Sequence, residues 1–261
     1  MLGVTLRTTY VGLELLADTG KGRRTFSYVS LDHDLKLLAV GEGSLNDVLA
    51  YAGGQAEAFV AVNSPRRPNQ GLMRKEEVRQ RLVPPPKAPS WRGHRVAEYL
   101  MRQHNIPILP TSNQAEACPP WMQAGFELFR QLDKMGFVPY PAEDSLRQSL
   151  EVYSHATFCA LLGQAPFPRA SLEGRLQRQL VLYEQGIKVP DPMRFFEEVT
   201  TFKLLHGVLP LKEIYSPGGL DAFAAAFAAW SAATKPGEVT LLGAPEEGQI
   251  VIPIQALKEH Y

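Results

Sequence analysis

The sequence predicts an α/β fold in which a mixed sheet is flanked by helices. Short apolar runs bounded by turn residues alternate with stretches of helical length. Two neighbouring runs are spaced as an antiparallel hairpin, and a later run is apolar throughout, which is typical of a strand in a parallel sheet. The 261 residues are 45% hydrophobic, which is enough for one core. We therefore expect a single domain over residues 1–261, with an insertion or flap over residues 66–147.

Strands are predicted near the start of the chain. Residues 1–6 are apolar around Gly3 and predict a buried strand. Residues 25–31 and 35–40 predict the hairpin, because turn-forming residues join them. Residues 58–62, AFVAV, predict a fully buried strand that joins the first one in parallel. Functional residues are expected where these strands end, since sites form at the carboxyl ends of such strands.

Helices are predicted between and after these strands. Ser44 is a suitable N-cap for a short helix that a Gly-Gly pair would end. Residues 66–90 are charged and finish in a Pro-rich run, which predicts an extended arm or flap. Amphipathic helices are then expected over residues 96–102 and 122–135.

The second half of the chain predicts two more strands and three more helices. These elements are expected at residues 149–153, 157–162, 172–185, 219–230 and 249–253. Residues 219–230 predict an apolar helix of small residues. Asp221 is expected in its first turn, where a negative charge suits the helix dipole.

Charge and cysteine content restrict the function classes. The 27 Lys and Arg residues balance the 27 Asp and Glu residues, so no global basic field attracts nucleic acid. Residues 66–102 are rich in cations, and they form either a track for phosphates or a solvated surface balanced by the acidic C-terminal third. Cys118 and Cys159 form no close pair, which favours a reducing cytoplasm. No apolar run approaches the roughly 20 residues that span a bilayer.

Six segments together resemble a known family. The Glu-Val-Tyr element and the Glu-Glu-Gly-Gln-Ile-Val tail are the most specific of them, and all six occur in the family's order. They are GVTL at 3–6, AVNSP at 61–65, EVYSHATFCALLG at 151–163, SLEGRLQRQ at 171–179, LDAFAAAFAAW at 220–230 and PEEGQIVIP at 245–253. The chain resembles the predicted-nuclease family catalogued as domain of unknown function 429, which is placed in the ribonuclease H-like superfamily. The resemblance implies a ribonuclease H-like sheet.

The resemblance also implies a metal site at one end of that sheet. In ribonuclease H-like enzymes, carboxylates from the first strand, a later strand and a C-terminal helix hold two divalent ions that cleave a phosphodiester. Mg²⁺ or Mn²⁺ is the implied cofactor. Glu151 and Asp221 stand at two of the family's acidic positions, whereas neutral Thr5 and Asn63 stand at the other two. Glu151 and Asp221 are thus the candidate metal ligands, and all four are candidate catalytic residues.

The two neutral residues make the predicted activity conditional. With Glu151 and Asp221 alone, we expect at most one weakly held ion and little or no hydrolysis. A further acid brought in by folding would change this expectation; those that the sequence leaves unplaced are Glu14, Asp18, Asp32, Asp191, Glu246 and Glu247. Without the resemblance, Glu151 is interpreted as a strand-end surface residue and Asp221 as a helix-start charge.

Arginines are the candidate substrate-binding residues. Arg175 and Arg178 belong to the family's GR-x-x-R pattern and either grip a phosphate or form salt bridges with the acids. Arg95, in the expected insertion, is a third candidate, although Glu98 could simply fix it by helical spacing. His155 is either a proton shuttle or a polar loop residue.

Three functions remain open on these grounds. The first is a nucleic-acid-associated protein whose ancestral metal-dependent phosphodiester hydrolysis is weakened or lost. The second is an active hydrolase of a nucleotide or another small phosphorylated substrate, using replacement ligands. The third is a non-catalytic interaction protein. Kinase, dehydrogenase, serine hydrolase and zinc protease functions have no motif in the sequence.

Overall fold

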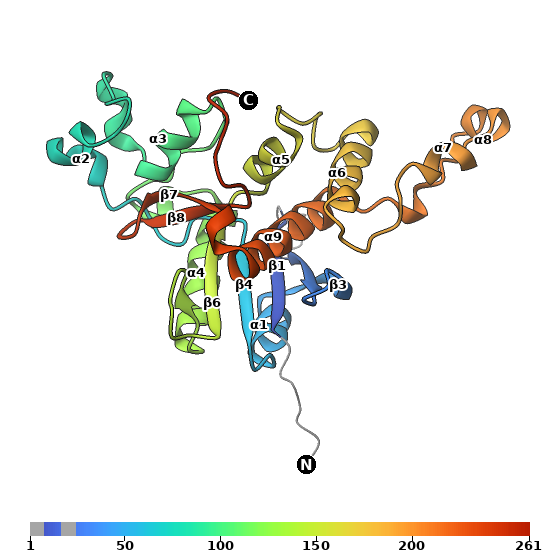
Figure 1. Cartoon of the computed structure of the whole chain (residues 1–261), viewed down its shortest axis with the longest axis horizontal. Helices are drawn as coiled ribbons and strands as arrows, with labels where there is room; N and C mark the ends of the chain where they lie inside the picture. The colour runs from blue at the N-terminus through green and yellow to red at the C-terminus, as the bar shows by residue number, and fades with distance from the viewer. Residues whose placement is uncertain (1–7, 17–24) are drawn as a thin grey trace, which may run out of the picture.

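One mixed sheet runs through the centre of the molecule (Figure 1). The computed structural model describes residues 8–16 and 25–261. Within them the sheet has eight strands in the order β3-β2-β1-β4-β6-β8-β7, with β5 also beside β6. The strands are β1 (Thr9–Leu15), β2 (Thr25–Leu31), β3 (Leu37–Ser44), β4 (Ala58–Val62), β5 (Val138–Pro139), β6 (Arg147–Val152), β7 (Thr240–Ala244) and β8 (Gly248–Ile252).

The pairing of the strands brings several carboxyl ends to one edge of the sheet. β1 pairs antiparallel with β2 and parallel with β4, and β4 and β8 both lie parallel to β6. The predicted hairpin and the α/β class are confirmed. The strand predicted over residues 58–62 lies parallel to β1, whereas its predicted partner, residues 1–6, lies outside the described residues. The chain has the mixed sheet and flanking helices of a ribonuclease H-like fold, and β1, β4 and β6 end side by side.

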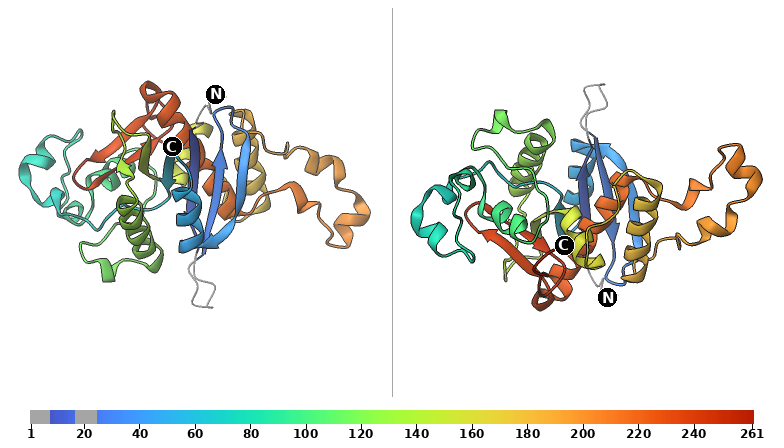
Figure 2. Two further views of the ribbon diagram at one scale, coloured as in Figure 1. Left: turned by 90° about the horizontal axis from the view of Figure 1, so that it is seen from below. Right: turned by 90° about the horizontal axis from the view of Figure 1, so that it is seen from above.

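Helices cover both faces of the sheet (Figures 1 and 2). α9, α5 and α6 lie on one face, and α1 and α4 lie on the other. α3 packs beside β7 and β8, while α7 and α8 project away from the body. The helices are α1 (Leu45–Gly53), α2 (Glu76–Gln80), α3 (Val96–Gln103), α4 (Pro120–Lys134), α5 (Ser154–Leu162), α6 (Leu172–Glu184), α7 (Arg194–Glu198), α8 (Thr201–Leu205) and α9 (Pro217–Thr234).

Small residues let α9 lie directly on β1. A Cβ atom added to Gly12 would lie 2.0 Å from the carbonyl oxygen of Ala222 and 2.2 Å from the backbone nitrogen of Ala226. Only glycine on the strand and alanine on the helix permit this approach. The close contact fixes the helix over the centre of the sheet, with Asp221 near the carboxyl end of β1.

Most element boundaries agree with the sequence pattern, and the differences have local causes. Ser44 caps α1 as predicted, and its hydroxyl accepts a hydrogen bond from Asp47 N. α9 begins at Pro217 rather than 219, because Ser216 is its N-cap and proline suits the first helical position. Asp221 therefore lies beyond the first turn, which corrects that prediction. β7 was not predicted, since its five residues show no alternation of apolar and polar side chains.

The predicted first strand, residues 1–6, lies outside the described residues. In the described sheet, β1 takes the first-strand place between β2 and β4. Residues 63–146, which include most of the expected insertion at 66–147, connect β4 to β6 and contain α2, α3 and α4. No helix within residues 8–16 and 25–261 is long and apolar enough to cross a membrane.

Candidate functional site

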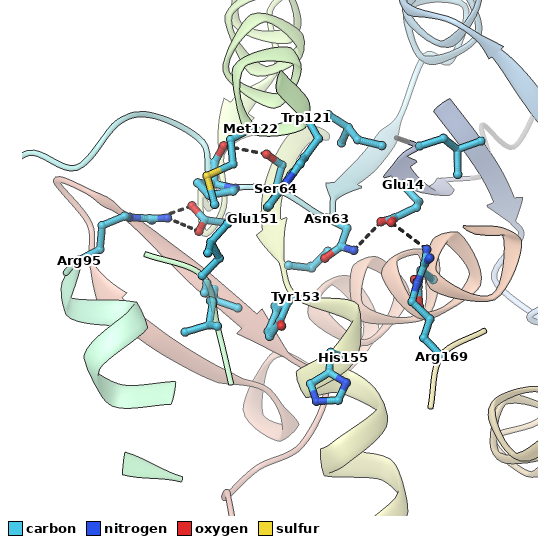
Figure 3. A pocket seen from close by; sticks show the side chains of 18 of the residues that line it. Glu14, Asn63, Ser64, Arg95, Trp121, Met122, Glu151, Tyr153, His155 and Arg169 are labelled. Atoms are coloured by element: carbon cyan, nitrogen blue, oxygen red, sulfur yellow. Dashed lines mark hydrogen bonds and ion pairs between the residues drawn. The ribbon is translucent and has the colours of Figure 1, made fainter. Parts of the chain in front are cut away.

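The carboxyl ends of β1, β4 and β6 border a cavity of about 420 Å³. Acids, arginines, Asn63 and His155 form its polar part (Figure 3). Its apolar wall includes Trp121 and Met122 of α4, together with Ile108 from the segment between β4 and β6. The volume is typical of a pocket for one small ligand.

Glu14 and Asp221 share one arginine in this cavity. Arg169 Nε donates a hydrogen bond to Asp221 Oδ2 at 2.5 Å, and its NH2 donates to Glu14 Oε1 at 3.1 Å. Glu14 is the second-last residue of β1, Asp221 belongs to α9, and Arg169 lies on the loop between α5 and α6. Both acids are buried, whereas the Arg169 side chain is 48% exposed. The guanidinium therefore lies between two carboxylates, where a bound cation would otherwise balance their charge.

Asn63 presents a donor, not an oxygen, to this cluster. Its Oδ1 accepts a hydrogen bond from the backbone N–H of Ser154 at 3.0 Å, and its Nδ2 donates to Glu14 Oε2 (Figure 3). Because a backbone N–H only donates, Ser154 fixes the orientation of the amide. The carbonyl oxygen that could have ligated a metal is thus turned away from Glu14.

Two carboxylates with one guanidinium leave an excess negative charge. Burial, together with the nearby charge of Asp221, raises the pKa of Glu14 from its ordinary 4.5 to about 8. Burial also raises the pKa of Asp221, while Arg169 opposes that shift. A pKa of about 8 means that Glu14 holds a proton at neutral pH.

Glu151 is held by a different arginine. Arg95 NH1 and NH2 donate to its two carboxylate oxygens at 2.6 and 2.8 Å, and the backbone N–H of Arg66 donates to Oε2 at 3.0 Å. Arg95 NH2 also donates to the carbonyl oxygens of Glu247 and Gly248. Glu151 is 5% exposed and Arg95 is 1% exposed. This buried pair ties the segment after β4 to β6 and β8.

These residues do not fit a pair of divalent ions in this arrangement. Arginines engage Glu14, Asp221 and both oxygens of Glu151, and Asn63 directs an N–H group at Glu14. Hard divalent ions need several free oxygen ligands with enough negative charge. In residues 8–16 and 25–261, no three His, Cys, Asp or Glu side chains are grouped to hold a metal. The protein's own guanidinium groups supply the positive charge here.

The predicted arginines have different positions. Arg178 lines the cavity, where its NH1 donates to the carbonyl oxygen of Phe167 at 2.9 Å. Its buried Nε has no hydrogen-bond partner among the described residues. Arg175 is not among the cavity-lining residues; it donates to the carbonyl oxygens of Ile214 and Tyr215. Arg95 lines the cavity, but Glu151 and two carbonyl groups occupy its guanidinium.

The other candidate residues are divided between the cavity and distant places. His155 lines the cavity, and burial followed by the charge of Arg178 lowers its pKa. Thr5 and Asp18 lie outside the described residues. Asp32 closes the turn after β2, at the opposite edge of the sheet, and Glu247 accepts hydrogen bonds from the backbone N–H groups of Leu72 and Val96. Of the six unplaced acids, Glu14 lines the cavity.

A comparison with protein families identifies the family of the chain. The model described as "Protein of unknown function (DUF429)" matches residues 58–247. The chain belongs to the DUF429 family. The match contains Asn63, Glu151, Arg169 and Asp221, whereas Glu14 precedes it. Searches of curated proteins and of solved structures gave no match for this DUF429 chain.

Sequence reasoning placed neither of the two residues at the centre of this DUF429 site: Glu14 was one of six unplaced acids, and Arg169 was not a candidate. Glu14 is the second-last residue of the run TYVGLEL, which is largely apolar and contains a glycine, so that run carried a signal for a buried first strand. Arg169 carried no comparable signal, because it lies on a loop and reaches Asp221 across 52 positions of sequence.

Proposed function

We propose that this DUF429 protein binds a nucleotide or another small phosphorylated ligand in the cavity, and that metal-dependent phosphodiester hydrolysis is weakened or lost. The observation that carries the proposal is the position of Arg169 between Glu14 and Asp221. A guanidinium there supplies charge that a ribonuclease H-like nuclease would take from divalent ions.

The charge of the cavity supports an anionic ligand. Arg95 balances Glu151, and Arg169 balances the single negative charge that Glu14 and Asp221 share when one of them is protonated. Arg178 then adds a positive charge, which donates hydrogen bonds to carbonyl oxygens and forms no ion pair among the described residues. The guanidinium groups of Arg169 and Arg178, beside an apolar wall, suit a ligand with a phosphate and an aromatic or apolar group.

The overall charge supports a small ligand over a long duplex. The chain has a formal net charge of zero, and the expected insertion at 66–147 contributes apolar wall residues such as Trp121. Binding to a duplex draws mainly on a wide cationic surface. A cavity for one small ligand needs only local positive charge.

The test is to measure two kinds of binding to the same variants by calorimetry. We expect Arg169→Gln to weaken binding of nucleoside monophosphates in the presence of EDTA at least tenfold. The same change should strengthen binding of Mn²⁺, because it frees Glu14 and Asp221. Arg130→Gln is the matched control, since Arg130 is an exposed arginine of α4 that pairs with Glu127.

Two outcomes would contradict the proposal. One is tight Mn²⁺ binding by the wild-type protein together with cleavage of oligonucleotides. The other is nucleotide binding that Arg169→Gln leaves unchanged. Affinity for single-stranded and duplex oligonucleotides, measured over a range of salt concentrations, separates a small ligand from nucleic acid.

A second candidate is an active hydrolase of a small phosphorylated substrate. The observation that favours it is Glu14, a third acid at the carboxyl end of β1 that takes the place expected for a replacement ligand. With a pKa near 8, it could exchange a proton with a substrate at neutral pH. Release of phosphate from nucleotides that Glu14→Gln abolishes would favour this candidate.

A further inference from the structure

The segment 190–213, which we call the arm, carries an unusual amount of exposed apolar surface. It contains α7 and α8 and extends away from the rest of the molecule in all three views (Figures 1 and 2). Half of the large hydrophobic residues that are exposed in the described part of the chain belong to it. They are Met193, Phe196, Phe202, Leu204, Leu205, Val208 and Leu211.

Hydrogen bonds from α6 hold both ends of the arm in place. The buried amide of Gln179 in α6 donates to the carbonyl oxygens of Pro190 and Glu213, at 3.0 and 2.8 Å, and so holds both ends of the arm. Arg175, one turn earlier, donates to the carbonyl oxygens of Ile214 and Tyr215. The family-pattern arginine Arg175 thus anchors the base of the arm.

The exposed area is close to what a stable interface needs. Phe202 is 69% exposed and Leu205 is 78% exposed. Together the seven side chains present on the order of 700 Å² to solvent, given roughly 150–200 Å² for each when fully exposed. This total exceeds the area of the largest apolar patch on a typical monomer. A standard interface buries about 800 Å² on each partner.

The charges of the arm favour a second copy of the same chain. In the half of the arm that holds α7, Asp191, Glu197 and Glu198 outnumber Arg194. In the half that holds α8, Lys203 and Lys212 outnumber Glu213, so the two halves carry opposite net charges. A twofold axis would place the acidic half of one arm opposite the basic half of the other. The arm has no cationic excess for an anionic membrane, and a chain of zero net charge does not repel its copy.

We propose that the arm packs against the arm of a second copy to form a twofold symmetric dimer. The exposed side chains of α7 and α8 form the apolar centre of this interface, and the charged residues form its rim. This assembly is independent of the ligand in the cavity.

Sedimentation velocity of the full chain tests the proposal. We expect a dimer for the wild type and a monomer for the double variant Phe202→Glu, Leu205→Glu, with unchanged circular dichroism. The matched control is Val83→Glu, Leu146→Glu, which alters two exposed apolar residues outside the arm and should remain dimeric. A wild-type monomer at all concentrations, or a dimer that survives the arm substitutions, would overturn the proposal.

A charge exchange tests the twofold arrangement. Glu197→Lys with Glu198→Lys should weaken the dimer at least tenfold, because two basic halves would then meet. Adding Lys212→Glu should restore part of the affinity. A protein that stays monomeric but binds neutral phosphatidylcholine vesicles through the arm would also overturn the proposal, since a membrane would then be the partner.

Discussion

Arg169 and Asp221 form an ion pair between a loop and the helix that packs directly on the central strand. The donor nitrogen lies 2.5 Å from the carboxylate oxygen, and the same guanidinium also reaches Glu14. Because Asp221 is buried and Arg169 is half exposed, the arginine can leave the cluster more easily than the acid. The pair therefore controls how much negative charge the cavity presents.

Replacing Arg169 should make thermal stability respond to a divalent ion. In Arg169→Gln, Glu14 and Asp221 lose the guanidinium that pairs with both of them, so Mn²⁺ that binds the folded state should raise the melting temperature. The wild type should show no such increase. Scanning fluorimetry with and without Mn²⁺ measures both, and Arg130→Gln should behave as the wild type. An equal response in all three proteins would place the ion elsewhere.

Glu14 should make stability depend on pH. Its pKa is raised in the folded state, so the folded protein keeps a proton that the unfolded chain has already lost between pH 4.5 and about 8. Stability should therefore fall as the pH rises through this range, and be unaffected by Glu14 below it. Glu14→Gln should flatten the fall and be more stable than the wild type at pH 8. Urea unfolding at several pH values tests the slope; parallel curves for the two proteins would contradict the assignment.

Breaking the pair of Glu151 and Arg95 should cost more stability than removing a surface charge. Glu151→Gln leaves the buried Arg95 without its negative partner, and the expected loss is about 3 kcal/mol. The control is Glu246→Gln, which alters an exposed acid in the turn between β7 and β8. It should change stability by less than about 0.5 kcal/mol. Chemical denaturation measures both. A small loss in Glu151→Gln would show that Arg95 is balanced without it.

The contact between β1 and α9 should not tolerate even one methyl group. In Gly12→Ala the new Cβ would meet the backbone of Ala222 and Ala226, so the helix must move and the core must repack. We expect a loss of at least about 2 kcal/mol. Gly237→Ala is the control, because nothing lies within 4 Å of the added carbon there. Equal stability of the two variants would mean that α9 shifts at little cost.

The sequence predicted the sheet better than the site. The strands over Thr25–Leu31 and Ala58–Val62 were placed to the residue, because apolar runs flanked by turn residues depend on local chemistry. The cluster of Glu14, Arg169 and Asp221 depends instead on three segments that the fold brings together. The spacing of residues along the chain does not indicate that these three segments come into contact.

Position 63 shows why the residue types alone were insufficient. The sequence indicated that a neutral amide stands at this position, but not which end of that amide faces the cluster. That orientation depends on the backbone N–H of Ser154, at the start of α5. Likewise, the pairing of Arg95 with Glu151 spans 56 positions and needed the completed sheet to be seen.

The hydrogen bond from Asn63 to Glu14 also has a consequence for redesigning the site. An aspartate at position 63 would replace an N–H donor with a further carboxylate oxygen against Glu14, while Arg169 remained the only cation that forms ion pairs with Glu14 and Asp221 in the part of the chain that the structure describes. That single variant is electrostatically unfavourable. Converting the cluster into an acidic metal site would thus require the loss of Arg169 before or together with the change at position 63, so the order of the two substitutions matters.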